Sequence, residues 1–534
     1  VYHESMRRHL STQKSAPWFL LGGILLLVCL LYLPSLGNQF VTWDDEFLIY
    51  GNPWLRALNF KTIAHVFTHF DPELYVPLPL LTYQIVAAVF GWNPAAFHAV
   101  SVVLFLTATT LVFWLTDKLT QNRTVAVLLT LLWALHPLNS AAVLWASALK
   151  DLLSSVFFLA SVLAYLHFRE NDLRKIYVAS VLLFAIGLLC KVSIAFLPPI
   201  LLLIDLLQKR KISAAALVEK IPYVLLSVVF LLVAFLGKGQ TIGSLTFLET
   251  SSLSLRAILF STLHILWPAP LAIIYPVALP VSILSLSTLL SALFLAVLLL
   301  LAFLSRKRLP WLTFGLVWFL ILLIPSFGTF RKGVGITLTS DQYLLLPMIG
   351  LLLPIAAGLA ALLALGRKLD RGITLAGILL VLIPFSFLSA SRVRVWHDSG
   401  SLYRDTLALF PDNAAMHNNL GLFYTNSGKY AEALVEFDRV LVLEPSDADA
   451  HTDRGYIFQM QGKKAEALKE FQIALTLDPD NAEAYNNRGT MYFDDHKYTQ
   501  AIADFSAAVK AKPSYVQAWN NLAAAYGKTG QYTE

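Results

Sequence analysis

The sequence predicts an all-α protein: a polytopic bundle of membrane-spanning helices followed by a helical solenoid. Of its 534 residues, 57% are hydrophobic and only 14% are charged, whereas a globular domain has roughly 25% charged residues. The apolar residues form long runs separated by short clusters of Lys and Arg. From Trp396 onward these runs stop, and prolines recur every 34 residues at Pro411, Pro445, Pro479 and Pro513.

The net charge of +6 does not indicate a nucleic-acid partner. The basic residues lie in clusters between apolar runs, which is the pattern of membrane topology. Cys29 and Cys190 lie in or beside apolar runs, which argues against a disulfide framework and against a Cys-based zinc site.

Residues 1–16 are basic and predict a cytoplasmic N-terminus, followed by an uncleaved first helix over residues 17–36. Residues 37–93 form an external loop whose apolar part, Tyr75 to Phe90, does not cross the membrane. Only this assignment, with a second non-crossing helix at Leu253 to Leu266, puts all later basic clusters on the cytoplasmic side. The eleven predicted crossings are 17–36, 94–116, 124–137, 151–168, 174–190, 192–208, 221–237, 281–304, 309–326, 343–365 and 371–390.

The 34-residue period continues in small and aromatic residues. In phase with the prolines run Gly421, Gly455 and Gly489, then Ala433, Ala467 and Ala501, then Phe437, Phe471 and Phe505. This pattern resembles the tetratricopeptide repeat (TPR), in which paired helices stack because neither buries its apolar face alone. The domains expected are a membrane domain at 17–390, a linker and half-repeat at 391–410, and an extracytoplasmic array at 411–534 with three full repeats and part of a fourth.

The predicted topology gathers four polar stretches on one face of the membrane: Trp43 to Glu46, His136 to Asp151, Cys190 to Ser193, and Thr329 to Tyr343. Carboxylates and cations near hydrocarbon are expensive and usually functional. Cations there can hold a lipid phosphate, and a carboxylate can accept a proton.

Several strings in these stretches resemble a known family. They are FVTWDDEFLIYGNPWLR, HPLNSAAVLWASALKDLLSSVFFLASVLAY, GLLCKVSIAFLPPILLLIDLL, WPAPLAIIYP and SDQYLLLPMIG, and the repeats follow them. Together they resemble the multi-pass glycosyltransferases of the C type (GT-C), above all the repeat-bearing transmembrane O-mannosyltransferases and their bacterial counterparts. The resemblance implies a GT-C-like bundle of about eleven crossings. It also implies inverting transfer of a sugar from a polyprenyl-phosphate carrier to an acceptor hydroxyl, with the repeats recruiting an acceptor protein.

In that family an acidic pair lies in the first external loop, and the matching residues are Asp44 and Asp45. We assign Asp44 as the general base and Asp45 as its partner or an acceptor-positioning group. The alternative is an acidic cap on a helix next to the membrane. Supporting or acceptor-side roles fall to Glu46, Asp151, Asp341 and Gln342.

The candidates for holding the donor phosphate are His136, Lys150 and Lys191, each of which matches a family string. For His136 a helix-capping role is an equal alternative. For Lys150 the alternative is an ion pair with its neighbour Asp151. A Lys between two apolar runs, as at Lys191, is costly unless it is paired.

The chain departs from the family pattern at Ala141, Ala142 and Gln342, so phosphate binding is also assigned to Arg331 and Lys332. No cofactor is certain. A divalent metal at Asp44 and Asp45 stays open, because some C-type relatives use one.

These observations predict a multi-pass protein of the plasma (inner) membrane that is a lipid-linked-sugar-dependent glycosyltransferase. The competing hypothesis is a catalytically inactive, membrane-anchored repeat scaffold for envelope assembly. Transport is a weaker third, because few charges lie in mid-span.

Overall fold

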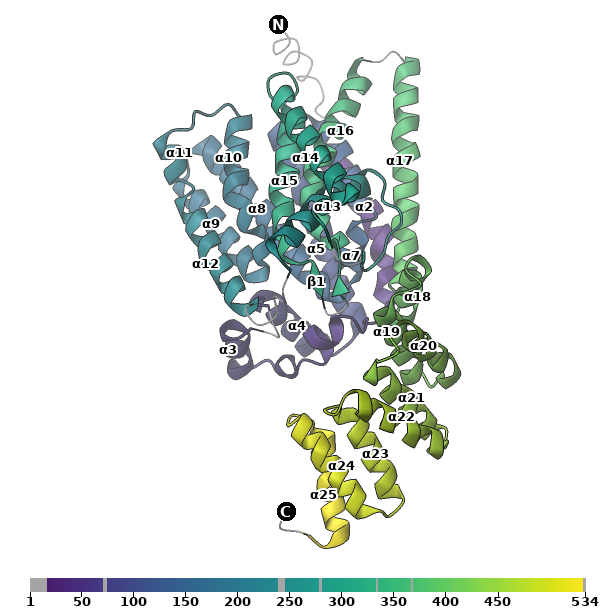
Figure 1. Ribbon diagram of the computed structural model, residues 1–534. Helices are drawn as coiled ribbons and strands as arrows, with labels where there is room; N and C mark the ends of the chain where they lie inside the picture. Colours follow the sequence, from purple (N-terminus) through teal and green to yellow (C-terminus); the bar gives the residue numbers. More distant parts are fainter. Residues whose placement is uncertain are drawn as a thin grey trace. The chain divides into compact units, whose positions relative to one another are not determined.

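The computed structural model describes residues 17–70, 74–238, 245–277, 281–332, 335–365 and 368–531. The chain forms two compact units that divide after Asp398 (Figure 1). The first unit holds the apolar helices and the second holds the repeats.

The first unit is built from α-helices joined by short turns. They are α2 (Pro17–Tyr32), α3 (Phe60–Thr68), α4 (Pro77–Phe90), α5 (Pro94–Thr120), α6 (Arg123–Ala134), α7 (Asn139–Leu144), α8 (Leu149–Asn171), α9 (Arg174–Cys190), α10 (Leu197–Leu207), α11 (Ala214–Val218), α12 (Ile221–Lys238), α13 (Phe247–Leu266), α14 (Leu286–Ser305), α15 (Pro310–Leu323), α16 (Pro347–Leu365) and α17 (Lys368–Val395). Short 3-10 or π-helical turns lie between them at η1 (Leu33–Gly37), η2 (Glu46–Tyr50), η3 (Pro53–Leu55), η4 (Ala146–Ala148), η5 (Val192–Phe196), η6 (Ile324–Gly328) and η7 (Asp341–Leu344).

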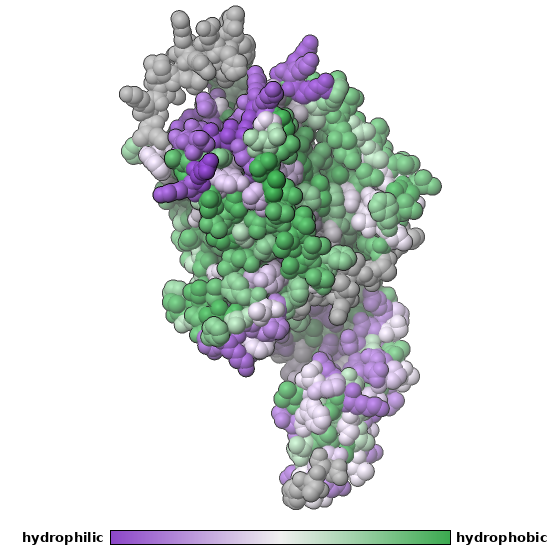
Figure 2. All heavy atoms as spheres, turned by 90° about the vertical axis from the view of Figure 1, so that its left-hand side faces the viewer, coloured by the Kyte–Doolittle hydropathy of each residue, from purple (hydrophilic) through white to green (hydrophobic). Residues whose placement is uncertain are grey.

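The all-α membrane bundle predicted from the sequence is confirmed. Within the described ranges, eight helices are long and apolar enough to cross a membrane. Each of the eleven predicted crossings corresponds to a helix, but α6, α9 and the η5–α10 segment are shorter than 18 residues. Figure 2 shows the broad hydrophobic band that these helices form, with hydrophilic side chains gathered beyond one edge of it.

Local sequence signals set the helix boundaries. Proline stands in the first turn of α4, α5 and α15, where its missing N–H costs nothing. The side chains of Asn93 and Asn122 cap the first N–H groups of α5 and α6. Helices α15 and α16 pack backbone against backbone: a Cβ added to Gly315 would lie only 2.2 Å from the carbonyl oxygen of Gly350. Glycine at this position therefore permits the close approach.

The two ends of the first unit differ in chemistry. One end carries α11 and the turns rich in Lys and Arg; ion pairs join Lys118 to Glu170 and Arg169 to Glu219 there, so these turns lie together. We call it the basic end. The opposite end carries α3, α4 and β1 (Figure 1) together with the loop at Asp44 and Asp45. We call it the acidic end.

A two-stranded antiparallel ribbon is the one addition to the helices in the described part of this unit. β1 (Arg331–Lys332) pairs with β2 (Gly335–Ile336), with Arg331 opposite Ile336 and Lys332 opposite Gly335. Thr337 continues the pairing to Pro276. The ribbon therefore attaches the Thr329 to Tyr343 stretch to the segment after α13.

The second unit is an array of helical hairpins. It contains α18 (Ser399–Leu409), α19 (Ala414–Asn426), α20 (Tyr430–Leu443), α21 (Ala448–Met460), α22 (Lys464–Leu477), α23 (Ala482–Asp494), α24 (Tyr498–Ala511) and α25 (Val516–Thr529).

The contacts within the hairpins explain the 34-residue period. A Cβ on Gly421, Gly455 or Gly489 would lie 2.6–2.8 Å from the ring of the Phe sixteen residues later in the chain. Only glycine therefore lets the two helices of each hairpin approach this closely. The phenylalanines of the three hairpins are fully or almost fully buried.

Candidate functional site

Asp45 is buried and its carboxylate is fully used by the protein. Oδ2 accepts the backbone N–H of Val41 at 3.0 Å, and Oδ1 accepts both the backbone N–H (2.9 Å) and the hydroxyl of Ser147. Burial raises the pKa of Asp45 to about 6, against the lowering effect of these hydrogen bonds, and the nearby Asp44 carboxylate raises it further. Asp45 thus ties the loop that follows η1 to η4, more than one hundred residues away in the chain.

Asp44 differs from its neighbour. Its side chain is half-buried, and within the described part of the chain its carboxylate has no hydrogen-bond or ion-pair partner. Its backbone carbonyl accepts the N–H of Leu48 at the start of η2. The main chain is therefore fixed while the carboxylate is available. Glu46, the first residue of η2, is exposed.

Lys191 and Asp151 form a partly buried ion pair. The side chains are 16% and 8% exposed, and Lys191 Nζ also lies 4.6 Å from the ring centre of Tyr343. Asp151 belongs to the first turn of α8, and Lys191 precedes η5. The structure therefore brings together residues from all four polar stretches, through Asp45 with Ser147, Asp151 with Lys191, and Lys191 with Tyr343.

Lys150 is a cation of a different kind. Asp151 is paired with Lys191, so the alternative of a Lys150–Asp151 pair does not occur. Lys150 is half-buried, its Nζ lies 5.8 Å from the ring centre of Trp145, and it has no anionic partner among the described residues. It begins α8 directly after η4, which holds Asp45. An unpaired cation and an unpaired carboxylate thus flank the same buried anchor.

His136 is completely buried. Its Nε2 lies 2.9 Å from the carbonyl oxygen of Ile265, and its Nδ1 accepts the N–H of Leu138. Both ring nitrogens are thus used inside the protein. These contacts match the capping alternative and leave no nitrogen for a phosphate.

Asp341 and Gln342 lie in η7 and are both buried. Asp341 Oδ1 accepts the hydroxyl of Tyr275 at 2.8 Å, and His264 Nε2 lies 2.8 Å from that hydroxyl. This cluster joins η7 to α13 and to the segment after it. The backbones of Arg331 and Lys332 form β1, but their side chains lie outside the described residues.

The two carboxylates of the acidic pair differ as potential ligands of a metal ion. Both oxygens of Asp45 already accept hydrogen bonds from the protein, whereas the Asp44 carboxylate accepts none from the described residues. The described ranges contain no group of three or more His, Cys, Asp or Glu side chains that could hold one.

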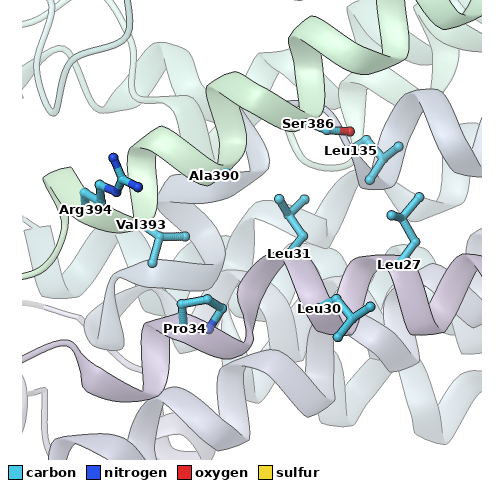
Figure 3. A pocket seen from close by; sticks show the side chains of 9 residues that line it. All are labelled: Leu27, Leu30, Leu31, Pro34, Leu135, Ser386, Ala390, Val393 and Arg394. Atoms are coloured by element: carbon cyan, nitrogen blue, oxygen red, sulfur yellow. The ribbon is translucent and has the colours of Figure 1, made fainter.

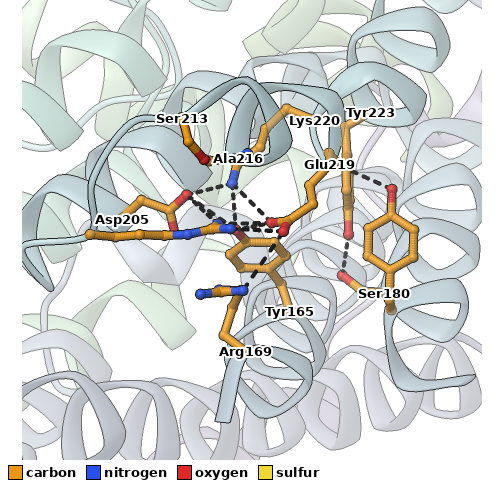
Figure 4. Close-up of polar contacts among 11 residues, drawn as sticks. Tyr165, Arg169, Ser180, Asp205, Ser213, Ala216, Glu219, Lys220 and Tyr223 are labelled. Atoms are coloured by element: carbon orange, nitrogen blue, oxygen red, sulfur yellow. Dashed lines mark hydrogen bonds and ion pairs between the residues drawn. The ribbon is translucent and has the colours of Figure 1, made fainter. Parts of the chain in front are cut away.

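The basic end contains a second polar cluster, which the sequence reasoning missed (Figure 4). Asp205 and Lys220 are paired and almost fully buried, and Tyr165 donates to Asp205 Oδ1 at 3.1 Å. Arg210 reaches Asp205 at 3.0 Å and Glu219 at 2.7 Å. The signal that could have revealed it is the lone Asp205 inside the apolar string ILLLIDLL. Its acids and bases are all paired, which fits a structural joint among α8, α10 and α12.

The fold and these contacts define a class: a polytopic helical membrane protein with one polar face, joined to a tetratricopeptide-repeat array. Family models of the tetratricopeptide repeat match residues 452–514 and 486–534, and a further TPR repeat model matches residues 422–462. The predicted repeat domain is confirmed.

The chain is similar to repeat-bearing membrane O-mannosyltransferases. It is 32% identical over 147 residues to protein O-mannosyl-transferase TMTC1 of Homo sapiens, covering 26% of this chain and 17% of the relative. It is 29% identical over 184 residues to protein O-mannosyl-transferase Tmtc1 of Drosophila melanogaster, covering 32% and 21%. The matches thus span about a fifth of these relatives. The crystal structure of MamA protein matches 25% of this chain and 73% of its own at 25% identity, with a TM-score of 0.22, which is too low to support an argument.

Proposed function

We propose that the protein is a glycosyltransferase that transfers a sugar from a polyprenyl-phosphate carrier to a hydroxyl group of a protein acceptor. The observation that carries the proposal is the contrast between two adjacent carboxylates. Asp45 is held by three hydrogen bonds, whereas the half-buried carboxylate of Asp44 has no partner among the residues that the structure describes. The sequence relatives are named protein O-mannosyl-transferases, which supports the transfer of a sugar to a protein acceptor.

In the proposed reaction the acceptor hydroxyl attacks the anomeric carbon of the carrier-linked sugar. A bond forms between the acceptor oxygen and that carbon, and the bond from the carbon to the phosphate oxygen breaks. Asp44 takes the hydroxyl proton as general base. The leaving phosphate carries negative charge, which a nearby cation stabilises. Lys150 is the cation best suited to this role, because Lys191 is already neutralised by Asp151.

The repeats are proposed to recruit the protein acceptor. Tetratricopeptide arrays stack into extended surfaces suited to binding other proteins. Asn38 Nδ2 donates to the carbonyl of Val393, so α17 ends at the acidic end of the first unit. The basic clusters at the other end favour a cytoplasmic position for that end, in the plasma (inner) membrane.

The test uses the full chain in lipid nanodiscs with a polyprenyl-phosphate-linked mannose and an acceptor protein, and it detects added hexose by mass spectrometry. Asp44→Asn is expected to lower the transfer rate by about a hundredfold or more, the range for loss of a general base. The control is Asp172→Asn, because Asp172 is exposed at the basic end with φ of 52°, a conformation that Asn also adopts. Transfer at wild-type rate by the Asp44 variant would remove the catalytic assignment.

The scaffold hypothesis predicts a different result. A scaffold without activity would show no transfer in any variant, and deleting the gene would leave cell-envelope glycans and glycoproteins unchanged in mass. A deletion that removes a hexose from a defined set of proteins would support the transferase.

A further inference from the structure

A groove of about 400 Å³ opens on the surface of the first unit between α2 and α17 (Figure 3). Its lining comes mainly from Leu27 and Leu31 of α2, Pro34 of the adjoining η1 turn, and Ser386, Ala390 and Val393 of α17. Asp44, Lys150 and Lys191 do not line it, and no step of the proposed transfer uses it.

The groove is accessible from the membrane. Leu27 and Leu30 on its α2 side are 43% and 60% exposed, although both are large and apolar. The spanning windows of α2 and α17 are only 28% and 22% buried within the protein, so both helices face lipid. The groove is therefore open to the hydrocarbon of a bilayer that these helices would cross.

One end of the groove carries a positive charge. Arg394 lines it beside Val393, in the last turn of α17. The side chain is exposed and has no acidic partner in the described part of the chain. Asn38 holds Val393 at this point, so the cation stands at the acidic end, where the hydrocarbon stops. A guanidinium at that depth meets the headgroups and presents several donors to a phosphate.

The length of the groove restricts its occupant. From Leu27 to Pro34 the lining extends for roughly 10 Å along the helix, and from Ser386 to Arg394 for roughly 12 Å. The hydrocarbon core is roughly 30 Å thick, so the groove remains within one leaflet. This length suits a phospholipid acyl chain, whose headgroup lies at the same surface.

From the groove and its terminal guanidinium we infer that the protein binds one anionic phospholipid between α2 and α17, with an acyl chain against Leu31 and Ala390 and the headgroup phosphate on Arg394. Charge complementarity selects an anionic headgroup over a zwitterionic one. The site is independent of the sugar transfer and does not rest on the proposed function.

Native mass spectrometry of the delipidated full chain tests this inference, with phosphatidylglycerol, phosphatidylcholine and a polyprenyl phosphate as separate probes. The wild-type protein is expected to bind one phosphatidylglycerol about tenfold more tightly than phosphatidylcholine. Arg394→Gln is expected to abolish that preference. Ala390→Phe fills the groove and is expected to weaken both phospholipids about tenfold.

Two matched controls lie on the same helix. Arg371→Gln removes an exposed guanidinium at the opposite end of α17, and Ala376→Phe adds a ring at an exposed position outside the groove. Both are expected to bind like the wild type. The inference is overturned if the two phospholipids bind equally to the wild type, or if the polyprenyl phosphate displaces phosphatidylglycerol at equal concentration. It is also overturned if Arg394→Gln keeps the preference for phosphatidylglycerol, or if Arg371→Gln loses that preference to the same extent. Should Ala390→Phe fail to fold, the comparison of the two arginines still decides.

Discussion

The basic end and the acidic end both hold partly buried acids and cations, but they satisfy them differently. At the basic end, Asp205 is bonded by Lys220, Arg210 and Tyr165, and Glu219 is bonded by Arg210. At the acidic end, Asp45 and the Asp151–Lys191 pair are satisfied, whereas Asp44 and Lys150 have no oppositely charged partner in the described part of the chain.

This difference distinguishes charged residues with a structural role from those available for binding or catalysis. A closed network of charges stabilises the packing of helices and leaves nothing for a ligand to bind. A carboxylate and a cation that each lack a charged partner near hydrocarbon have a cost in the folded state, and that cost is expected where a substrate completes the interactions. Four predictions test the contrast, from the largest expected effect to the smallest.

The largest effect is expected from breaking the closed network with Lys220→Met. The change leaves Asp205 buried beside one fewer cation, and removing one partner of a buried pair costs roughly 3–5 kcal/mol of unfolding free energy. Thermal unfolding in detergent should show a clear loss of stability, with transfer per folded molecule unchanged. Lys211→Met, at an exposed position, serves as the control, and a double Lys220→Met, Asp205→Asn variant should recover part of the loss. A strong fall in transfer by the folded Lys220 variant would contradict the structural role.

Asp45→Ala should weaken both stability and transfer. It removes the acceptor of three hydrogen bonds and leaves buried donors on Val41 and Ser147 unsatisfied, at a cost of roughly 1–3 kcal/mol. Ser147→Ala removes only the hydroxyl bond and should cost roughly 1 kcal/mol. Thermal unfolding and transfer would be measured on the same samples. If Asp45→Ala lowered transfer without affecting stability, Asp45 would have to act in the chemistry itself.

Substitutions of Lys150 and Lys191 should affect protein stability differently when the two variants are compared in one experiment. Lys150→Met removes a cation without an anionic partner, so stability should change by less than about 1 kcal/mol while the KM for the carrier-linked sugar rises about tenfold or more. Lys191→Met leaves Asp151 without its partner and should lower stability as well. Equal losses of stability in the two variants would contradict the distinction between Lys191, which is paired with an acid, and Lys150, which is not.

The smallest effect is a pH dependence. The folded pKa of Asp45 is raised to about 6 from the ordinary value of 3.8, so the folded state binds more protons than the unfolded state between these values. The contribution of this group to stability is full below pH 3.8 and is lost as pH rises through 6, with a slope of at most about 1.4 kcal/mol per pH unit. Asp45→Asn should remove this component from the unfolding profile. A profile identical to that of the wild type would show that the pKa of Asp45 is the same in the folded and unfolded states, which would contradict the raised folded pKa.

Much of the site was predictable because charged residues in an apolar sequence are conspicuous. Asp44, Asp45, Lys150 and Lys191 all stood out as charges bordering apolar runs. The residues that pair with them could not be predicted, because pairing depends on which side chains lie close together in the folded protein. Nothing in the local sequence indicates that Asp151 pairs with Lys191 rather than with adjacent Lys150, or that His136 is buried against Ile265.

The sequence alone determined the class of the fold, since long apolar runs must be buried in lipid as hydrogen-bonded helices, and a 34-residue period of Gly, Ala and Phe specifies stacked hairpins. The tertiary structure decided which charges are satisfied, because that depends on backbone donors such as Ser147 N–H and on helices that meet only after packing. The type of a side chain determines which interactions it can make, and its neighbours in the folded protein determine whether it is available to a substrate.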